Sequence, residues 1–224
     1  MNCMKKRLEI LLLLLFIAFY SGSHAQPYAS DIAAFRKQDS ASFPGTGKIL
    51  FVGSSSFTNW KDVQSYFPSF PVINRGFGGS TLLDVYRYRQ DVIYPYQPRQ
   101  IIMYCGENDI ANDSMVSGKT VFRRFKKLYN DVGRTLGTVP FVYISMKPSP
   151  SRWHLREKYI EGNRLIRRFL EKKGNARIRF VSVWEAMLGS DGKPKPEIFL
   201  NDNLHMNATG YAIWKKLIEP LLIK

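Results

Sequence analysis

The sequence predicts an α/β domain built on a parallel sheet, and three observations support this. Five short apolar runs follow one another along the chain, and longer segments with helical spacing of apolar residues separate them. Runs that are apolar at nearly every position are typical of strands buried on both faces of a parallel sheet. The 224 residues suit one domain. Alternating strands and helices therefore favour a three-layer α/β/α sandwich around a five-stranded parallel sheet.

The expected strands are residues 48–52, 72–74, 100–105, 140–145 and 177–181. The expected helices are residues 30–38, 81–92, 119–136, 151–173 and 207–222. Within 119–136, apolar residues recur at spacings that place them on one side of a helix, which indicates one buried face. Gly174 is expected to end the helix before it, and Asn207 to cap the last helix.

The first 25 residues are typical of a secretory signal peptide. A positive segment at residues 5–7 precedes an apolar run at 8–20 that only Glu9 interrupts, and small residues follow up to Ala25. This order predicts cleavage after Ala25, export to the periplasm or the medium, and a mature domain at 26–224. A retained membrane anchor is the alternative, but the run is shorter than the roughly 20 apolar residues of a spanning helix.

The charge of +15 makes the chain strongly basic. Export and the lack of a nucleic-acid recognition motif argue against nucleic acid as a partner. Other anionic surfaces are therefore the better candidate partners. No membrane span is expected after cleavage. Cys105 is the one cysteine of the mature chain, which excludes an internal disulfide. No pair of His or Cys residues has metal-ligand spacing, and neither a metal nor an organic cofactor is expected.

Histidine is scarce, and that narrows the search for a general base. Only His154 and His205 follow the predicted cleavage site. Asp202 lies three residues before His205, just ahead of the last predicted helix, whereas no acidic residue lies close before His154. A carboxylate at that spacing can accept the Nδ1 proton and orient the imidazole. His205 with Asp202 is therefore the better candidate.

Three loops that follow predicted strands carry the other candidate groups. The first strand ends in a glycine followed by Ser54, Ser55 and Ser56. A glycine-rich segment containing Gly79 follows the second strand, and Asn108 follows the third. Because ligands bind at the carboxyl ends of parallel strands, these loops are expected to meet there. Each signal also has a plain structural interpretation, as a helix cap, a tight turn or an Asx turn.

The order of these four blocks resembles the SGNH, or GDSL-type, hydrolase family. The resemblance covers residue 48 to the C-terminus, and residues 76–80 and 147–153 are similar to platelet-activating-factor acetylhydrolase-like bacterial esterases. It implies the strand order 2-1-3-4-5. It also implies Ser55 as nucleophile, and an oxyanion hole of the Ser55 N–H, Gly79 and Asn108. His205 would be the base, oriented by Asp202.

One departure concerns the first block, where the family usually has aspartate before the nucleophile and this chain has Ser54. Ser54 and Ser56 therefore stay open as alternative nucleophiles. The function expected is hydrolysis of carboxylic esters through an acyl-enzyme, with small acyl groups such as O-acetyl on carbohydrates preferred. The alternatives are a lysophospholipase or acyl-lipid esterase, and a non-catalytic glycan-binding protein on the same fold. The substrate is a small molecule or glycan ester, and the sequence does not predict an oligomeric state.

Overall fold

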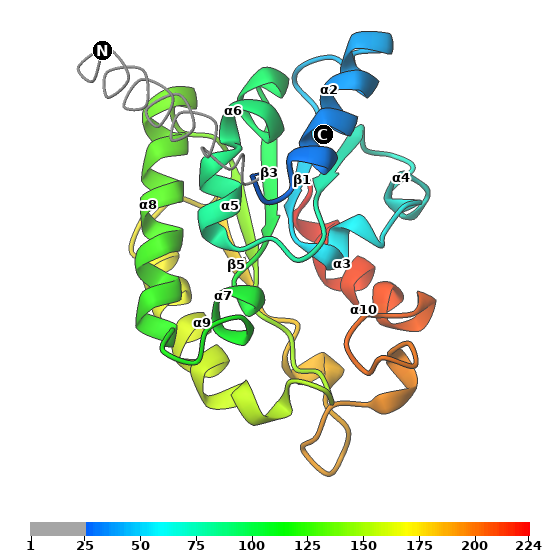
Figure 1. Cartoon of the computed structure of the whole chain (residues 1–224), viewed down its shortest axis with the longest axis vertical. Coiled ribbons are helices and arrows are strands. Elements are labelled where there is room, and N and C mark those ends of the chain that lie inside the picture. The colour runs from blue at the N-terminus through cyan, green and yellow to red at the C-terminus, as the bar shows by residue number, and fades with distance from the viewer. Residues whose placement is uncertain (1–25) are drawn as a thin grey trace, which may run out of the picture.

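The computed structural model describes residues 26–224, so the predicted signal peptide and its cleavage site lie outside the described residues. A five-stranded parallel sheet has the order β2-β1-β3-β4-β5. The strands are β1 Ile49–Gly53, β2 Val72–Gly76, β3 Gln100–Tyr104, β4 Phe141–Ile144 and β5 Ile178–Val181. The order equals the one that the family resemblance implies. Figure 1 shows the sheet between two layers of helices.

Side chains of each central strand alternate between two hydrophobic cores, one on each face of the sheet. Leu50, Val52 and Met103 point into the first core, while Phe51 and Ile102 point into the second. All residues of β1, β3 and β4 are buried. Burial on both faces explains why these strands are apolar at nearly every position.

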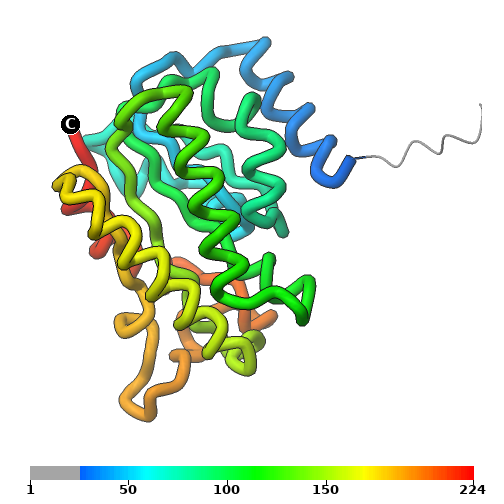
Figure 2. The backbone as a smooth tube through the Cα atoms, turned by 90° about the vertical axis from the view of Figure 1, so that its left-hand side faces the viewer, coloured from blue at the N-terminus to red at the C-terminus, as the bar shows by residue number. Residues whose placement is uncertain are grey.

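Five helices cover the first face of the sheet. They are α2 Ala29–Ala41, α5 Leu82–Arg87, α6 Arg89–Val92, α8 Gly118–Leu136 and α9 Arg156–Glu171. Figure 2 shows α8 and α9, in green and yellow, side by side. Two glycines allow this close approach, since a Cβ on Gly118 would lie 2.5 Å from the backbone nitrogen of Gly162.

Three helices cover the opposite face. They are α3 Ser55–Thr58, α4 Val63–Tyr66 and α10 Ala208–Ile218. An aromatic cluster fills the space between these helices and the sheet, with Trp60 stacked on Tyr211 at 4.7 Å between ring centroids. Trp60 and Trp214 are fully buried. The packing fixes α10, and the turn before it, against α3.

Some expected element bounds are wrong. Segment 81–92 forms two helices rather than one, because the backbone of Tyr88 (φ −96°, ψ 13°) leaves the helical conformation. The helix expected from residue 151 begins at Arg156, after the 3₁₀ turn Trp153–Leu155. Residues 151–152 form a turn ahead of this 3₁₀ segment, so the α-helix starts five residues later than expected. The short helices α3, α4 and α7 (Glu107–Ala111) were not predicted.

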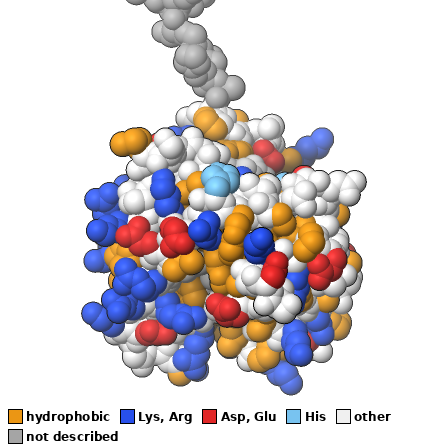
Figure 3. Space-filling view, turned by 90° about the horizontal axis from the view of Figure 1, so that it is seen from below, with side chains coloured by type: hydrophobic (Ala, Val, Ile, Leu, Met, Phe, Trp, Pro, Cys, Tyr) orange, Lys and Arg blue, Asp and Glu red, His pale blue; other side chains and the backbone are white. Residues whose placement is uncertain are grey.

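The carboxyl edge of the sheet faces the viewer in Figure 3, where Lys and Arg side chains gather mainly on the side of α8 and α9. The exposed cations of these two helices are Lys119, Arg123, Lys126, Lys127, Arg134, Arg164, Arg167 and Arg168. The positive charge of the chain is therefore uneven over the molecule. Within residues 26–224, no helix is both long and apolar enough to cross a membrane.

Candidate active site

The three-serine turn directly follows β1 and begins α3. The backbone N–H of Ser54 donates to the carbonyl of Tyr104 (3.0 Å), so the turn is bonded to the end of the neighbouring strand β3. Gly53 is required at this junction, because its φ is +146° and a Cβ there would lie 1.9 Å from the Tyr104 carbonyl oxygen. Ser54 and Ser56 are buried, at 4% and 1% exposed, whereas Ser55 is partly exposed.

The glycine-rich loop between β2 and α5 lies against this turn. Phe77 N donates to the Gly53 carbonyl at 2.9 Å, and Ser80 Oγ donates to the same carbonyl at 3.2 Å. A Cβ on Gly78 would lie 4.0 Å from the Cβ of Ser55. Gly79 has a φ of +80°, a conformation that favours glycine. Its carbonyl accepts a hydrogen bond from Tyr28 Oη (2.8 Å), which fixes the loop to the segment before α2.

Asn108 comes from α7 and contacts both of these segments. Its Nδ2 donates to Ser54 Oγ at 2.7 Å and to the carbonyl of Ser80 at 3.0 Å. The next residue, Asp109, accepts from Leu82 N (2.9 Å) and pairs with Arg124 (2.8 Å). The Gly-Glu-Asn-Asp segment that was interpreted as a turn is therefore a short helix that binds three segments together. The structure places Ser54, Ser55, Gly79 and Asn108 at one edge of the sheet, as expected.

Asp202 and His205 form a hydrogen-bonded pair on the turn before α10. Asp202 Oδ2 lies 2.5 Å from His205 Nδ1, and Asp202 Oδ1 accepts from the backbone nitrogens of Leu204 and His205 (both 2.9 Å). Partial burial alone would raise the pKa of Asp202, but the hydrogen bonds from His205 and Leu204 lower it to about 2. The carboxylate thus stays ionised and orients the imidazole through Nδ1.

Two hydrogen bonds fix the position of this turn. Tyr211 Oη, from α10, donates to the carbonyl of Ser56 (2.8 Å), and the backbone N–H of Ser151 donates to the carbonyl of Asn203 (3.1 Å). The His205 turn therefore lies between α3 and the segment that follows β4. No hydrogen bond joins His205 to Ser55 in the described part of the chain.

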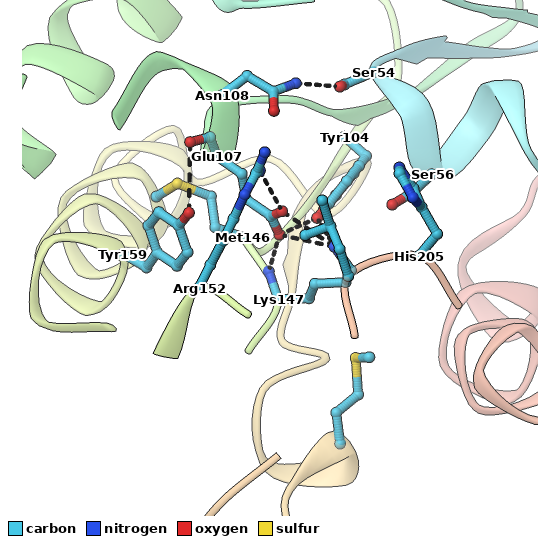
Figure 4. A network of polar contacts seen from close by, with 12 residues as sticks. Ser54, Ser56, Tyr104, Glu107, Asn108, Met146, Lys147, Arg152, Tyr159 and His205 are labelled. Carbon is cyan, nitrogen blue, oxygen red and sulfur yellow. Dashed lines mark hydrogen bonds and ion pairs between the residues drawn. The ribbon is translucent and has the colours of Figure 1, made fainter. Parts of the chain in front are cut away.

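A buried ionic network under the site was not predicted. The Glu107 carboxylate accepts from Lys147 Nζ (3.1 Å), Lys147 N (2.9 Å) and the Tyr104 hydroxyl, and it also contacts Arg152. Burial would raise the pKa of Glu107, but Lys147 and Arg152 lower it. Figure 4 shows this network beside Ser54, Asn108 and His205. The sequence signal was present, since the charged residues Glu107 and Lys147 each lie three positions after the end of a buried strand.

The remaining candidates have structural roles. Cys105 is buried and forms no disulfide, its Sγ donates to the Ser80 carbonyl at 3.6 Å, and burial raises the pKa of the thiol well above its ordinary value. Trp60 lies in the core, and Trp153 stacks on Trp184 at 6.0 Å between centroids. His154 is exposed in the 3₁₀ turn before α9, and none of the ion pairs within residues 26–224 joins it to an acid.

The low pKa of Asp202 predicts an acid-dependent contribution to stability. Because folding lowers this pKa from 3.8 to about 2, the contribution is complete above pH 4 and disappears as the pH falls toward 2. Asp202→Asn is expected to cost at most about 1 kcal/mol at neutral pH, since the side chain is 46% exposed and solvent screens it. Urea unfolding of both proteins at several pH values checks this. If the wild type remained more stable than Asp202→Asn by the same free energy of unfolding at pH 5 and at pH 2.5, the prediction would be wrong.

The comparisons with known proteins decide the family. The sequence profile of the GDSL-like lipase/acylhydrolase family matches residues 39–213, which is most of the chain. The chain belongs to the GDSL-like lipase/acylhydrolase family. The resemblance noted in the sequence is therefore confirmed, and so is the prediction of a hydrolase that acts on ester bonds. Among curated proteins, none matches the sequence.

Solved structures of several other proteins have the same fold. A protein from Bacteroides fragilis assigned as an acylhydrolase has a TM-score of 0.70 at 22% identity, covering 89% of this chain and 96% of its own. A protein from Streptococcus pneumonia assigned as a platelet activating factor has a TM-score of 0.69 at 20% identity, covering 96% and 99%. An acetylxylan esterase from Geobacillus stearothermophilus has a TM-score of 0.61 at 14% identity, covering 80% and 96%. At these identities the likeness shows the fold.

Proposed function

We propose that this family member is a serine esterase in which Ser55 attacks the ester carbonyl and His205 accepts its proton. One observation carries the proposal: the pair Asp202–His205 is held beside the turn of three serines, at the edge that Gly79 and Asn108 also border. Among the three serines, Ser55 is the one whose side chain is partly exposed, while Ser54 and Ser56 are buried. A buried hydroxyl cannot reach a substrate without rearrangement.

The reaction proceeds in two steps. His205 takes the Ser55 proton as Oγ bonds to the carbonyl carbon, and then gives that proton to the departing alcohol. Water next attacks the acyl-enzyme with His205 again as base, and the acid is released. Asp202, ionised and bonded to Nδ1, leaves Nε2 as the basic nitrogen and stabilises the imidazolium.

The oxyanion is stabilised by the backbone N–H of Ser55 in the three-serine turn, by the backbone of Gly79 and by the side-chain amide of Asn108. Without substrate, both hydrogens of the Asn108 amide are already bonded, to Ser54 Oγ and to the Ser80 carbonyl. The amide must therefore exchange its bond to Ser54 for the oxyanion as the tetrahedral intermediate forms. The Ser54 hydroxyl holds Asn108 at the site until substrate arrives.

Removing that amide gives a testable result. Asn108→Ala is expected to lower kcat by about 10²–10³-fold, as for other single oxyanion donors. KM should change little, because the bond forms mainly in the transition state. Steady-state kinetics on an aryl acetate checks this, with Asn130→Ala, at an exposed position in α8, as the control. A change in KM alone would count against the oxyanion role.

Small acyl groups on carbohydrate are the substrates we propose. The Geobacillus stearothermophilus protein of the same fold is an acetylxylan esterase, which supports an O-acetyl sugar for this chain. Export through the leader at residues 1–25 would place the enzyme among extracellular glycans. A lysophospholipid or other acyl-lipid ester is the second candidate, favoured by the lipase members of the family.

Hydrolysis of p-nitrophenyl esters tests the function. The mature protein is assayed on the acetate, butyrate, octanoate and palmitate, beside Ser55→Ala and His205→Ala. We expect turnover that is highest on acetate and is lost in both variants while their circular dichroism is unchanged. Highest turnover on the long chains would favour the lipid ester, and inactivity on every ester would favour a glycan-binding protein.

A further inference from the structure

Arg152 lies between the two halves of the proposed active site. The residue before it, Ser151, is bonded through its backbone N–H to the turn that carries His205. Arg152 Nη1 itself donates to Glu107 Oε2 at 3.4 Å, and Glu107 precedes Asn108. Figure 4 shows the Arg152 side chain extended alongside Glu107, on the same side as Asn108. The guanidinium thus contacts the residue before Asn108, while the backbone beside Arg152 is bonded to the turn that carries His205.

Glu107 does not depend on Arg152 for its neutralisation. Its carboxylate is already engaged by the ammonium group of Lys147 at 3.1 Å, by the Lys147 N–H at 2.9 Å and by the hydroxyl of Tyr104. Lys147 is buried, with 2% of its side chain exposed, and Glu107 is the acid with which it forms an ion pair. The network therefore holds two cations for one buried anion, and Arg152 is the cation in excess.

The guanidinium also retains unused donors. A guanidinium carries five N–H donors, and within residues 26–224 this one contacts Glu107 (3.4 Å) and the hydroxyl of Tyr159, which leaves further donors for a ligand. The Arg152 side chain is 19% exposed, so a ligand can reach it. A planar fork of this kind suits a carboxylate, to which it can donate two parallel hydrogen bonds.

We propose that Arg152 binds a carboxylate on the substrate, so that the enzyme prefers O-acetylated acidic sugars, such as uronic acids, to neutral ones. The inference rests on the proposed function, since it places the acyl group at Ser55 and the acidic sugar at Arg152. Asp202 is the other anion nearby, and its bonds to His205 and to two backbone nitrogens occupy it.

A matched pair of substrates tests the preference. O-acetylated glucuronic acid carries a carboxylate where O-acetylated glucose carries a hydroxymethyl group. Hydrolysis of each sugar is followed by the release of acetate. We expect kcat/KM to be about tenfold or more higher on the acidic sugar, the effect of one charge-assisted hydrogen bond. In Arg152→Gln the two sugars should have equal kcat/KM, because KM for the acidic sugar rises. Arg152→Lys should keep part of the preference for the acidic sugar. Arg156→Gln, an exposed arginine paired with Glu157, should keep it all.

Binding to the Ser55→Ala variant separates this inference from the proposed function. Calorimetry gives the dissociation constants of the two sugars without any turnover, and the acidic sugar should bind about tenfold more tightly unless Arg152 is also changed to Gln. Tight binding of the acidic sugar without hydrolysis by the wild type would refute the esterase and keep the anion site. Equal dissociation constants, or a preference that persists in a folded Arg152→Gln protein, would overturn the anion site.

Discussion

Replacing Ser55 with alanine is expected to lower kcat on p-nitrophenyl acetate by roughly 10⁴–10⁶-fold, the loss typical when a serine nucleophile is removed. Ser54→Ala and Ser56→Ala provide matched controls on the same turn. The Ser54 hydroxyl accepts a hydrogen bond from Asn108, and Ser56 Oγ is buried without a partner in the described chain. Substituting either serine with alanine should therefore lower kcat far less than Ser55→Ala does. Burst kinetics with the wild type would report the acyl-enzyme.

The ordering of these three variants identifies the nucleophile. If Ser56→Ala abolished activity and Ser55→Ala did not, the α3 turn would have to rotate to expose a residue that is 1% exposed in the free protein. Melting temperatures of the three variants show whether each lost rate reflects chemistry or unfolding.

Replacing Lys147 with alanine is expected to destabilise the fold by about 3–5 kcal/mol, because removal of one partner leaves a buried charge without compensation. Glu107 would retain Tyr104 and the long contact to Arg152, but would lose the ammonium at 3.1 Å. Urea unfolding measures the free energy of unfolding. Lys37→Ala, an exposed position on α2, is the control, and its effect should stay within about 0.5 kcal/mol.

A double variant distinguishes the charge from the packing. Lys147→Met together with Glu107→Gln removes both charges while keeping similar volumes, and should be clearly more stable than Lys147→Ala. A double variant as unstable as the single one would show that the lysine chain contributes through shape rather than through its charge.

The sequence predicts the sheet well because the central strands are buried on both faces. A strand such as β3, with every residue buried, must be apolar throughout, and such a run is visible without any tertiary information. The same holds for the buried face of α8, which repeats along the helix. The existence of the strands was predictable from the residues, and their order came from the family resemblance. Helix bounds near Tyr88 and Arg156 depended on local backbone conformations that periodicity does not report.

The candidate residues could be named from the sequence, but their contacts could not. Asp202 and His205 are three apart on one turn, so their pairing follows from spacing alone. The bond from Asn108 to Ser54 joins residues 54 apart, and the Lys147–Glu107 pair joins residues 40 apart. Such contacts depend on how neighbouring strands end, which only the assembled sheet fixes. For this reason the ionic network, and with it Arg152, was missed.

The hydrogen bond from Tyr211 to Ser56 joins residues 155 apart, and this bears on the timing of synthesis. A ribosome adds about 5–20 residues each second, so about 8 to 30 s separate the emergence of Ser56 from that of Tyr211. During that interval the candidate nucleophile exists without its candidate base. A nascent chain is therefore expected to lack esterase activity until its last helix has been made, and ribosome-bound chains arrested before α10 would be inert.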